Sequence, residues 1–150
     1  WHTLPRSGGY QYANRLPPRP YPYQHFDDLP RRVYSVLTQV RTGHCFSGEY
    51  YYRRVPSESP SCPCGHHLQT REHVFTECPA YRRERWILRR ASPALMMTEL
   101  LGTQKGLEAV AGFIRATGAF TKSGRETWRR ALEEDASAMP APAITVSVLP

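Results

Sequence analysis

The sequence predicts a mostly α-helical domain, and three observations carry this prediction. Apolar side chains recur at positions i, i+3, i+4 and i+7 in two segments, which is the spacing of one buried helical face. They are Val33, Val36, Leu37 and Val40 in the first segment and Leu107, Val110, Ala111 and Ile114 in the second. Fourteen prolines and ten glycines keep the helices short. Three cysteines between residues 62 and 78, together with His73, indicate a small bundle of short helices around a metal-binding loop.

The first part of the chain changes from a proline-rich stretch to a helix. Residues 1–24 carry five prolines and two glycines, so we expect an extended linker with little regular structure. Asp28 is placed to cap the first helix, which has Pro30 in its first turn, where a missing N–H leaves no hydrogen bond unmade. Gly43 is placed to end this helix.

The middle of the chain is expected to alternate short helices with loops. Residues 48–54 predict a short helix or turn with three consecutive tyrosines, of which at least one should be partly exposed. Thr70 is placed to cap the next helix, and Pro79 should end it at Cys78. Residues 81–90 predict a further helix, with one basic stripe formed by Arg82, Arg85 and Arg89.

The last part of the chain should contain a longer helix and a tail. We expect the longer helix from Thr103, where the apolar spacing resumes, to Gly118. A polar helix is predicted over residues 123–136, and the Ala- and Pro-rich end from Ser137 is expected to be disordered. The predicted domains are therefore a Pro/Gly-rich linker over 1–24, a helical zinc-binding module over 25–122, and a polar helix with a disordered tail over 123–150.

The cysteines and the histidine in the middle of the chain have the composition of a tetrahedral zinc site. Thiolates and imidazoles suit zinc, and four protein ligands leave no open position for catalysis. Gly65 frees the turn that carries the first two cysteines to fold back on the ion. Five residues of helix rotate by roughly 140°, so the helix between the last two ligands must unwind. The predicted ligands are Cys62, Cys64, His73 and Cys78, with Zn²⁺ as cofactor.

Two alternatives to this site stay open at the level of the sequence. His66 and His67 compete with His73 for the fourth ligand position, although loop polarity also accounts for them. The four cysteines could instead form two disulfides. The first two cysteines of the cluster are too close to bridge each other comfortably, and Cys45 stands apart, so zinc is the better account. Cys45 is then a small buried residue or a free thiol.

Composition and motifs argue against an enzyme. The formal net charge is +7, and arginine supplies nearly all of the positive charge, because Lys105 and Lys122 are the only lysines. Such an excess favours a polyanionic partner, with a solvated basic surface as the alternative. The chain has three aspartates, no Gly-rich phosphate loop and no GxSxG motif, so we expect no catalytic activity from it alone.

We expect neither a signal peptide nor a membrane-spanning segment in this chain. It has no long apolar run, so we expect an intracellular protein, in the nucleus or cytoplasm, that is neither secreted nor bound to a membrane. Because it begins at Trp1, we expect a processed chain or a fragment of a longer one.

Short sequence blocks occur in a characteristic order along the chain. The first are Pro5-Arg6-Ser7-Gly8, Ala13-Asn14-Arg15-Leu16-Pro17-Pro18, Arg41-Thr42-Gly43-His44 and Gly48-Glu49-Tyr50-Tyr51. The next are Cys62-Pro63-Cys64-Gly65, Leu68-Gln69-Thr70-Arg71-Glu72-His73, Glu77-Cys78-Pro79 and Leu100-Leu101-Gly102-Thr103, followed by Gly118-Ala119-Phe120-Thr121-Lys122. Residues 1–124 thus resemble the C-terminal segment, downstream of the ribonuclease H domain, of polyproteins of non-LTR retrotransposons, particularly those of basidiomycete fungi.

The resemblance implies an accessory module. The parent polyprotein would carry reverse transcriptase and ribonuclease H activity in upstream domains, whose catalytic aspartates are absent from this chain. The cysteine–histidine segment resembles the zinc-knuckle-like CCHC element of such polyproteins, which implies the same four zinc ligands and a role in nucleic-acid binding. The tail after Gly124 lies outside the resemblance.

Two functions from different classes follow. The first is a zinc-stabilised nucleic-acid-binding module, with RNA or DNA as partner, single strands as the expected form, and upstream polyprotein domains as further partners. Arginines would contact phosphates, and tyrosines or Trp86 would stack on bases unless they pack in the core. The expected contact residues are Arg41, Tyr51, Arg53, Arg54, Arg82, Arg85 and Arg89, with Tyr50, Tyr52 and Arg83 as further candidates. The alternative is a purely structural zinc-clipped protein–protein or inter-domain module with solvated arginines.

Overall fold

The computed structural model describes residue 12, residues 28–124 and residues 126 and 127. None of these residues lies in a β-strand, and most of them lie in helices and turns, which confirms the predicted mostly α-helical fold of short helices. The expected linker over 1–24 lies outside the described residues, apart from Tyr12. The same holds for the predicted tail and for most of the polar helix expected over 123–136.

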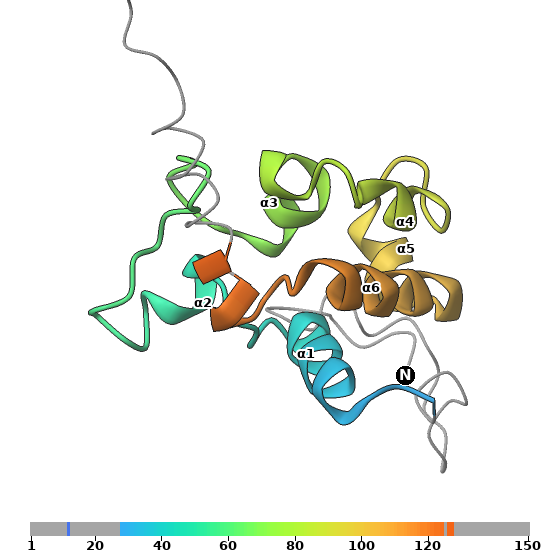
Figure 1. The fold of residues 1–150 in the computed structure, drawn as a ribbon, viewed down its shortest axis with the longest axis horizontal. Coiled ribbons are helices and arrows are strands. Elements are labelled where there is room, and N and C mark those ends of the chain that lie inside the picture. The colour runs from blue at the N-terminus through green and yellow to red at the C-terminus, as the bar shows by residue number, and fades with distance from the viewer. Residues whose placement is uncertain (1–11, 13–27, 125, 128–150) are drawn as a thin grey trace, which may run out of the picture.

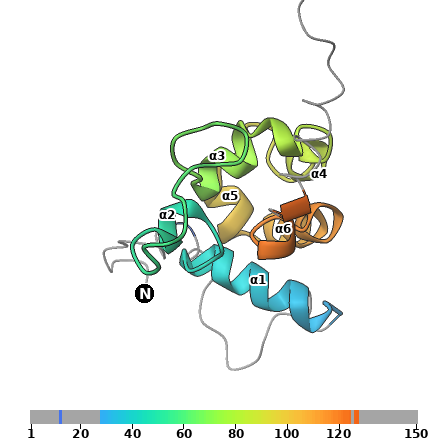
Figure 2. The ribbon, with the colours of Figure 1, turned by 60° about the vertical axis from the view of Figure 1, so that its left-hand side comes forward.

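Seven helical elements follow one another in the described part of the chain (Figure 1). They are α1 (Arg31–Thr42), α2 (Gly48–Tyr51), α3 (Arg71–Thr76), the 3₁₀ turn η3 (Pro79–Tyr81), α4 (Arg85–Arg89), α5 (Met97–Gly102) and α6 (Gln104–Thr117). Helices α1, α4 and α5 each pack against α6, whereas α3 packs against α4. Figures 1 and 2 show α1 and α4 on opposite sides of α6, which makes α6 the centre of the bundle.

The two longest helices bury the faces that their sequences predict. The four periodic valine and leucine side chains of α1 are buried, and Gly43 ends the helix in the left-handed conformation with φ 79°. In α6 the Thr103 side chain accepts a hydrogen bond from the Gly106 N–H at 3.0 Å, and Gly118 ends the helix with φ 65°. These caps satisfy backbone groups that a helix leaves unpaired at its ends.

The predicted start of α1 is wrong. Asp28 does not cap the helix, because Pro30 itself stands at the N-cap position with φ −52° and ψ 136°, and the helix begins at Arg31. A proline disfavours helical geometry in the residue before it, so Leu29 cannot continue a helix from Asp28. The proline therefore lies just before the first turn instead of within it.

Two further elements differ from the sequence-based expectation. The single helix expected over residues 81–90 is divided into η3, a turn and α4, which begins only at Arg85. Helix α5 has no counterpart among the predicted elements, because its six residues are too few to show a helical period.

The expected short helix after residue 48 is present as α2. Tyr52, which follows it, is 40% exposed, which confirms that at least one of the three tyrosines is accessible.

Aromatic rings join the middle of the chain to α6. The ring of Phe75 in α3 lies 5.8 Å from that of Phe113 in α6 and 5.3 Å from that of Phe120, both edge to face. The ring of Tyr81 in η3 contacts Phe113 in the same way at 5.6 Å. Such pairs add stabilisation beyond the area that they bury. The segment that carries the cysteines is therefore fixed to the core on both sides of residue 78.

Helices α5 and α6 approach each other closely because only Thr103 separates them. Gly106, in the first turn of α6, lies against the end of α5, so that a Cβ atom there would overlap the backbone carbonyl oxygens of Glu99 and Leu100. Gly112 lies two turns later in the same helix, where a Cβ atom would meet only Cγ2 of Ile87 at 3.5 Å. The two glycines thus differ in the space around them.

We expect Gly106→Ala to destabilise the protein and Gly112→Ala to leave it unchanged or stabilise it. The first substitution forces the backbones of α5 and α6 apart, at a cost of about 1–3 kcal/mol, as in other overpacked sites. The second gains up to about 1 kcal/mol of helix propensity without a clash. Urea denaturation of both variants measures the difference, and equal free energies of unfolding would contradict the close approach.

Candidate metal centre

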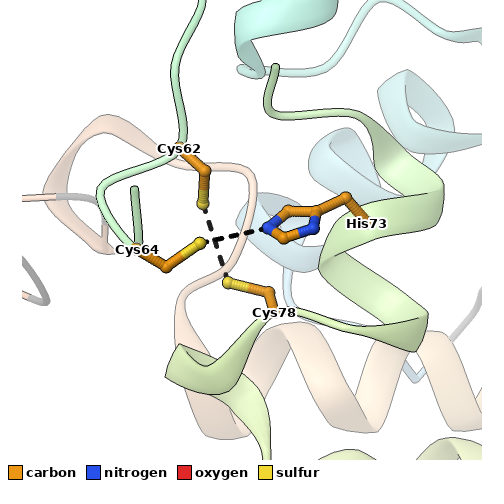
Figure 3. A group of neighbouring side chains, drawn as sticks. All are labelled: Cys62, Cys64, His73 and Cys78. Atoms are coloured by element: carbon orange, nitrogen blue, oxygen red, sulfur yellow. Dashed lines mark hydrogen bonds between the residues drawn. The ribbon is translucent and has the colours of Figure 1, made fainter. Parts of the chain in front are cut away.

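Two of the candidate ligands come from a tight turn that precedes α3. Cys62 and Cys64 stand at its beginning, and Gly65 has φ 94°, a conformation that glycine adopts readily. The Cys62 N–H donates to the carbonyl oxygen of His66 at 2.9 Å, and the Gly65 N–H donates to that of Cys62 at 3.0 Å. These hydrogen bonds fold the turn back so that both sulfur atoms lie on the same side (Figure 3).

The other two candidate ligands come from α3 and from the residues that follow it. The Thr70 side chain accepts a hydrogen bond from the His73 N–H at 2.9 Å, which confirms the predicted N-cap. The helix ends after Thr76, and the N–H groups of Glu77 and Cys78 both donate to the carbonyl oxygen of His73, at 3.0 and 2.8 Å. The chain therefore unwinds before Cys78, as the rotation between the two ligands requires.

The four side chains converge on one point. Sγ of Cys62 lies 3.6 Å from Sγ of Cys78, and Sγ of Cys64 lies 3.3 Å from Nε2 of His73. All four candidate ligand atoms lie within 4.8 Å of one another. Around a tetrahedral ion, bonds of about 2.3 Å to sulfur and 2.0–2.1 Å to nitrogen place neighbouring ligand atoms about 3.5–3.8 Å apart. The cluster of Cys62, Cys64, His73 and Cys78 can therefore hold a metal ion.

Burial and hydrogen bonding control the protonation of the thiols. Cys62 and Cys78 are buried, and Cys64 is partly exposed. The hydrogen bond from Cys78 lowers the pKa of Cys62 to about 5, and the same bond raises the pKa of Cys78. Burial raises the pKa of Cys64. Because zinc binds thiolates, a bound ion would displace any proton that these thiols carry.

A buried amide connects the cluster to α2. The side-chain Nε2 of Gln69 lies 3.7 Å from Sγ of Cys62, within donating distance of the sulfur. The backbone of Gln69 donates to the carbonyl oxygen of Pro60 at 2.8 Å and accepts from the N–H of Glu49 at 3.0 Å. Gln69 therefore holds both the loop before the cysteines and the start of α2.

Of the three histidines near the cluster, the structure places His73 with the cysteines. His66 belongs to a second group, with His73 and Glu77, and its Nδ1 is hydrogen-bonded to the carbonyl oxygen of Leu68 at 2.9 Å. His67 is exposed and belongs to neither group.

All four cysteines of the chain are free of disulfide bonds. Cys45 is fully buried away from the cluster, and burial raises its pKa to about 11.

The structure does not present Arg85, a predicted phosphate contact, at the surface. Its side chain is buried, and its guanidinium donates from Nε to the carbonyl oxygen of Phe75 at 2.8 Å and from the terminal amino group to that of Cys78 at 2.6 Å. Burial lowers the pKa of this arginine. The break in the expected helix over 81–90 turns this side chain inward, so the predicted stripe does not form. Arg85 holds the end of α3 and the candidate ligand Cys78 in place.

Arg71 has a similar role that the sequence did not reveal. Its side chain is buried, and its terminal amino group donates to the carbonyl oxygen of Val40 in the last turn of α1 at 2.9 Å. The Arg71 N–H also faces the carboxylate of Glu49 at 3.4 Å. Because its acceptor in α1 lies 31 positions earlier in the chain, no local pattern identifies it.

The remaining residues predicted to contact nucleic acid are distributed over two regions. Arg53, Arg54, Arg82 and Arg89 are exposed, whereas Arg41 and Tyr51 are partly buried. Two of the exposed arginines follow α2, and the other two lie just before and within α4. The structure also presents an exposed aromatic side chain in α4, Trp86, which is 57% exposed, with the guanidinium carbon of Arg90 5.9 Å from its ring centre.

Comparisons with known proteins leave the family of the chain open. No family model matches it, and no curated protein or solved structure matches it. The resemblance to retrotransposon polyproteins therefore stays a prediction.

Among the described residues, no helix is long and apolar enough to cross a membrane.

We expect Arg85→Met to destabilise the protein much more than Arg82→Met. The first substitution removes the hydrogen bonds from Arg85 to the carbonyl oxygens of Phe75 and Cys78 inside the protein, which costs about 2–4 kcal/mol. The second removes the same charge from an exposed position and should change the free energy of unfolding by about 0.5 kcal/mol at most. Chemical denaturation of the two variants gives the comparison, and similar losses would show that Arg85 is not a structural clamp.

Proposed function

We propose that this protein is a zinc-stabilised nucleic-acid-binding module that does not act as an enzyme by itself. Zinc is supported by the donor set, since three thiolates and one imidazole are soft to borderline ligands, and such ligands select zinc over magnesium or calcium. The four ligands close the coordination shell, which is typical of a structural ion. The ion would hold the turn at Cys62 against the end of α3.

Nucleic-acid binding rests mainly on arginine–aromatic pairs at the surface. Besides Arg90 over Trp86, the guanidinium carbon of Arg53 lies 5.5 Å from the ring centre of Tyr52, which is also exposed. Exposed aromatic rings stack on unpaired bases, and the arginines beside them attract phosphates. The formal charge of +7 acts in the same direction. Single-stranded RNA or DNA fits this combination, because its bases are free to stack.

The proposal extends to the origin of the chain. The ordered sequence blocks support an accessory segment of a retrotransposon polyprotein, whose upstream reverse transcriptase and ribonuclease H domains would be its partners inside the cell.

A second candidate is a structural module whose ion holds a protein–protein or inter-domain surface. The buried positions of Arg71 and Arg85 favour it, because these two arginines stabilise the fold and are not accessible to phosphates. The two candidates share the zinc centre and differ in what the exposed arginines contact.

We expect the purified protein to contain one zinc ion per chain and Cys64→Ser to lose it. Without the ion, the turn and the end of α3 are no longer joined, so the variant should unfold at a markedly lower temperature. Cys45→Ala is the matched control: it removes a buried thiol outside the cluster, so it should lower stability through lost packing and still retain one zinc. Metal analysis and thermal denaturation test this, and a metal-free wild type that remains folded would refute the zinc centre.

We expect a random single-stranded oligonucleotide to bind at low salt and to dissociate as salt rises, because phosphate contacts release counterions. Trp86→Ala should weaken binding by about 1–3 kcal/mol, the range for one base–aromatic stack. Tyr34→Ala, which removes an exposed ring from α1, should leave affinity unchanged. Fluorescence anisotropy measures all three proteins. Absence of binding by the zinc-loaded wild type at low salt would favour the structural alternative.

A further inference from the structure

His73 has two ring nitrogens with different surroundings. Nε2 lies 3.3 Å from Sγ of Cys64 and points into the cluster, as Figure 3 shows. Nδ1 is on the other side of the ring, buried, and has no hydrogen-bond partner among the described residues. A carboxylate oxygen of Glu77 lies 3.7 Å from Nδ1, slightly beyond hydrogen-bonding distance. One nitrogen is thus placed to bind an ion, and the other faces an acidic side chain.

The His73 ring is held in this orientation by a neighbouring ring. His66 stacks on it with ring centres 4.2 Å apart and an angle of 16° between the planes. The hydrogen bond between His66 Nδ1 and the carbonyl oxygen of Leu68 fixes the stacking ring in turn. Because an imidazole N–H lies in the plane of its ring, Nδ1 can donate only to a group at the edge of the ring.

Glu77 is able to close the remaining gap. It stands at the C-cap of α3, four residues after His73, and its side chain is 69% exposed. A small rotation of this exposed side chain brings the carboxylate to the distance of about 2.8 Å that is typical of charge-assisted hydrogen bonds. Histidines that bind metals commonly donate their second N–H to a carboxylate, which fixes the tautomer and makes the ligating nitrogen more basic.

We propose that Glu77 is a positioning residue of the metal centre. In the metal-bound protein its carboxylate accepts the Nδ1–H of His73, which keeps the lone pair of Nε2 directed at the ion. The inference rests on the proposed zinc centre and is independent of nucleic-acid binding. It adds a fifth residue to the site, outside the four ligands.

A different use of the same groups gives the competing outcome. Ligand atoms of His66, His73 and Glu77 lie within 4.8 Å of one another, so a second ion could bind them. That ion would require Nδ1 of His73 to lose its proton while Nε2 binds the first ion. Two equivalents of metal per chain, of which His66→Ala removes one, would therefore overturn the proposed hydrogen bond.

The first test compares zinc affinities by competition with a chelator. Glu77→Gln and Glu77→Ala should bind zinc about 10–100-fold more weakly than the wild type, as is typical when a partner of this kind is removed. Glu72→Gln is the matched control, because it removes the same charge from an exposed position of the same helix. It should stay within about twofold of the wild type if only the carboxylate at residue 77 supports the ligand.

The second test observes the hydrogen bond itself. In nitrogen-15 spectra of the zinc-bound wild type, the Nδ1 proton of His73 should resonate downfield and exchange slowly with water. In Glu77→Ala it should move upfield and exchange faster, whereas a merely structural role would leave it unchanged. The wild type could bind zinc while Glu77→Ala has the same zinc affinity as the control and an unchanged Nδ1 proton resonance. That result would overturn the role of Glu77 and leave the zinc centre standing. A wild type that binds no zinc would overturn the inference together with the zinc centre.

Discussion

The chain leaves helical geometry between Thr76 and Cys78, and the surrounding structure depends on this break. In a continuous helix the side chain at residue 78 would point roughly 140° away from His73. The break folds the chain back, with the N–H groups of Glu77 and Cys78 on the carbonyl oxygen of His73. Pro79 has no N–H to donate to the carbonyl oxygen of Phe75, so α3 cannot continue and the 3₁₀ turn η3 begins instead. Arg85 then donates to the carbonyl oxygens of Phe75 and Cys78, which lie on either side of the break. A buried guanidinium thus stabilises an irregular backbone at the metal centre.

The same break connects the metal centre to the hydrophobic core. Phe75 precedes it and Tyr81 follows it, and both rings contact Phe113 in the central helix α6. Cys62 and Cys78 themselves belong to the cluster of buried apolar residues. A chain of this length has a modest core. A bound ion would restrict the conformations of the segment that carries the packed rings, and the packed rings restrict the conformations of the segment that carries the cysteines. Ion binding at this cluster would therefore be coupled to the packing of the core.

The sequence predicts those features that depend on local chemistry. The apolar faces of α1 and α6, the cap at Thr70 and the four converging ligands all follow from spacing or donor type. The features that it fails to predict depend on phase or on distant contacts. The predicted basic stripe containing Arg85 requires one continuous helix over 81–90. The turn before α4 changes the direction in which the Arg85 side chain points, so this residue leaves the stripe. Arg71 meets its acceptor only after the chain has folded, and α5 is too short to show a period.

The two sides of α4 explain why net charge is an incomplete guide to the surface. Arg85 points inward to the carbonyl oxygen of Cys78, whereas the next residue, Trp86, is exposed beside Arg90. A helix of five residues therefore carries both the clamp on a metal ligand and the aromatic–arginine pair proposed to contact a base. Because Arg85 donates to the carbonyl oxygens of both Phe75 and Cys78, disorder at the candidate metal centre would weaken the attachment of α4 to the end of α3. Zinc would then do more than stabilise the fold, since it would also support the proposed binding surface on α4.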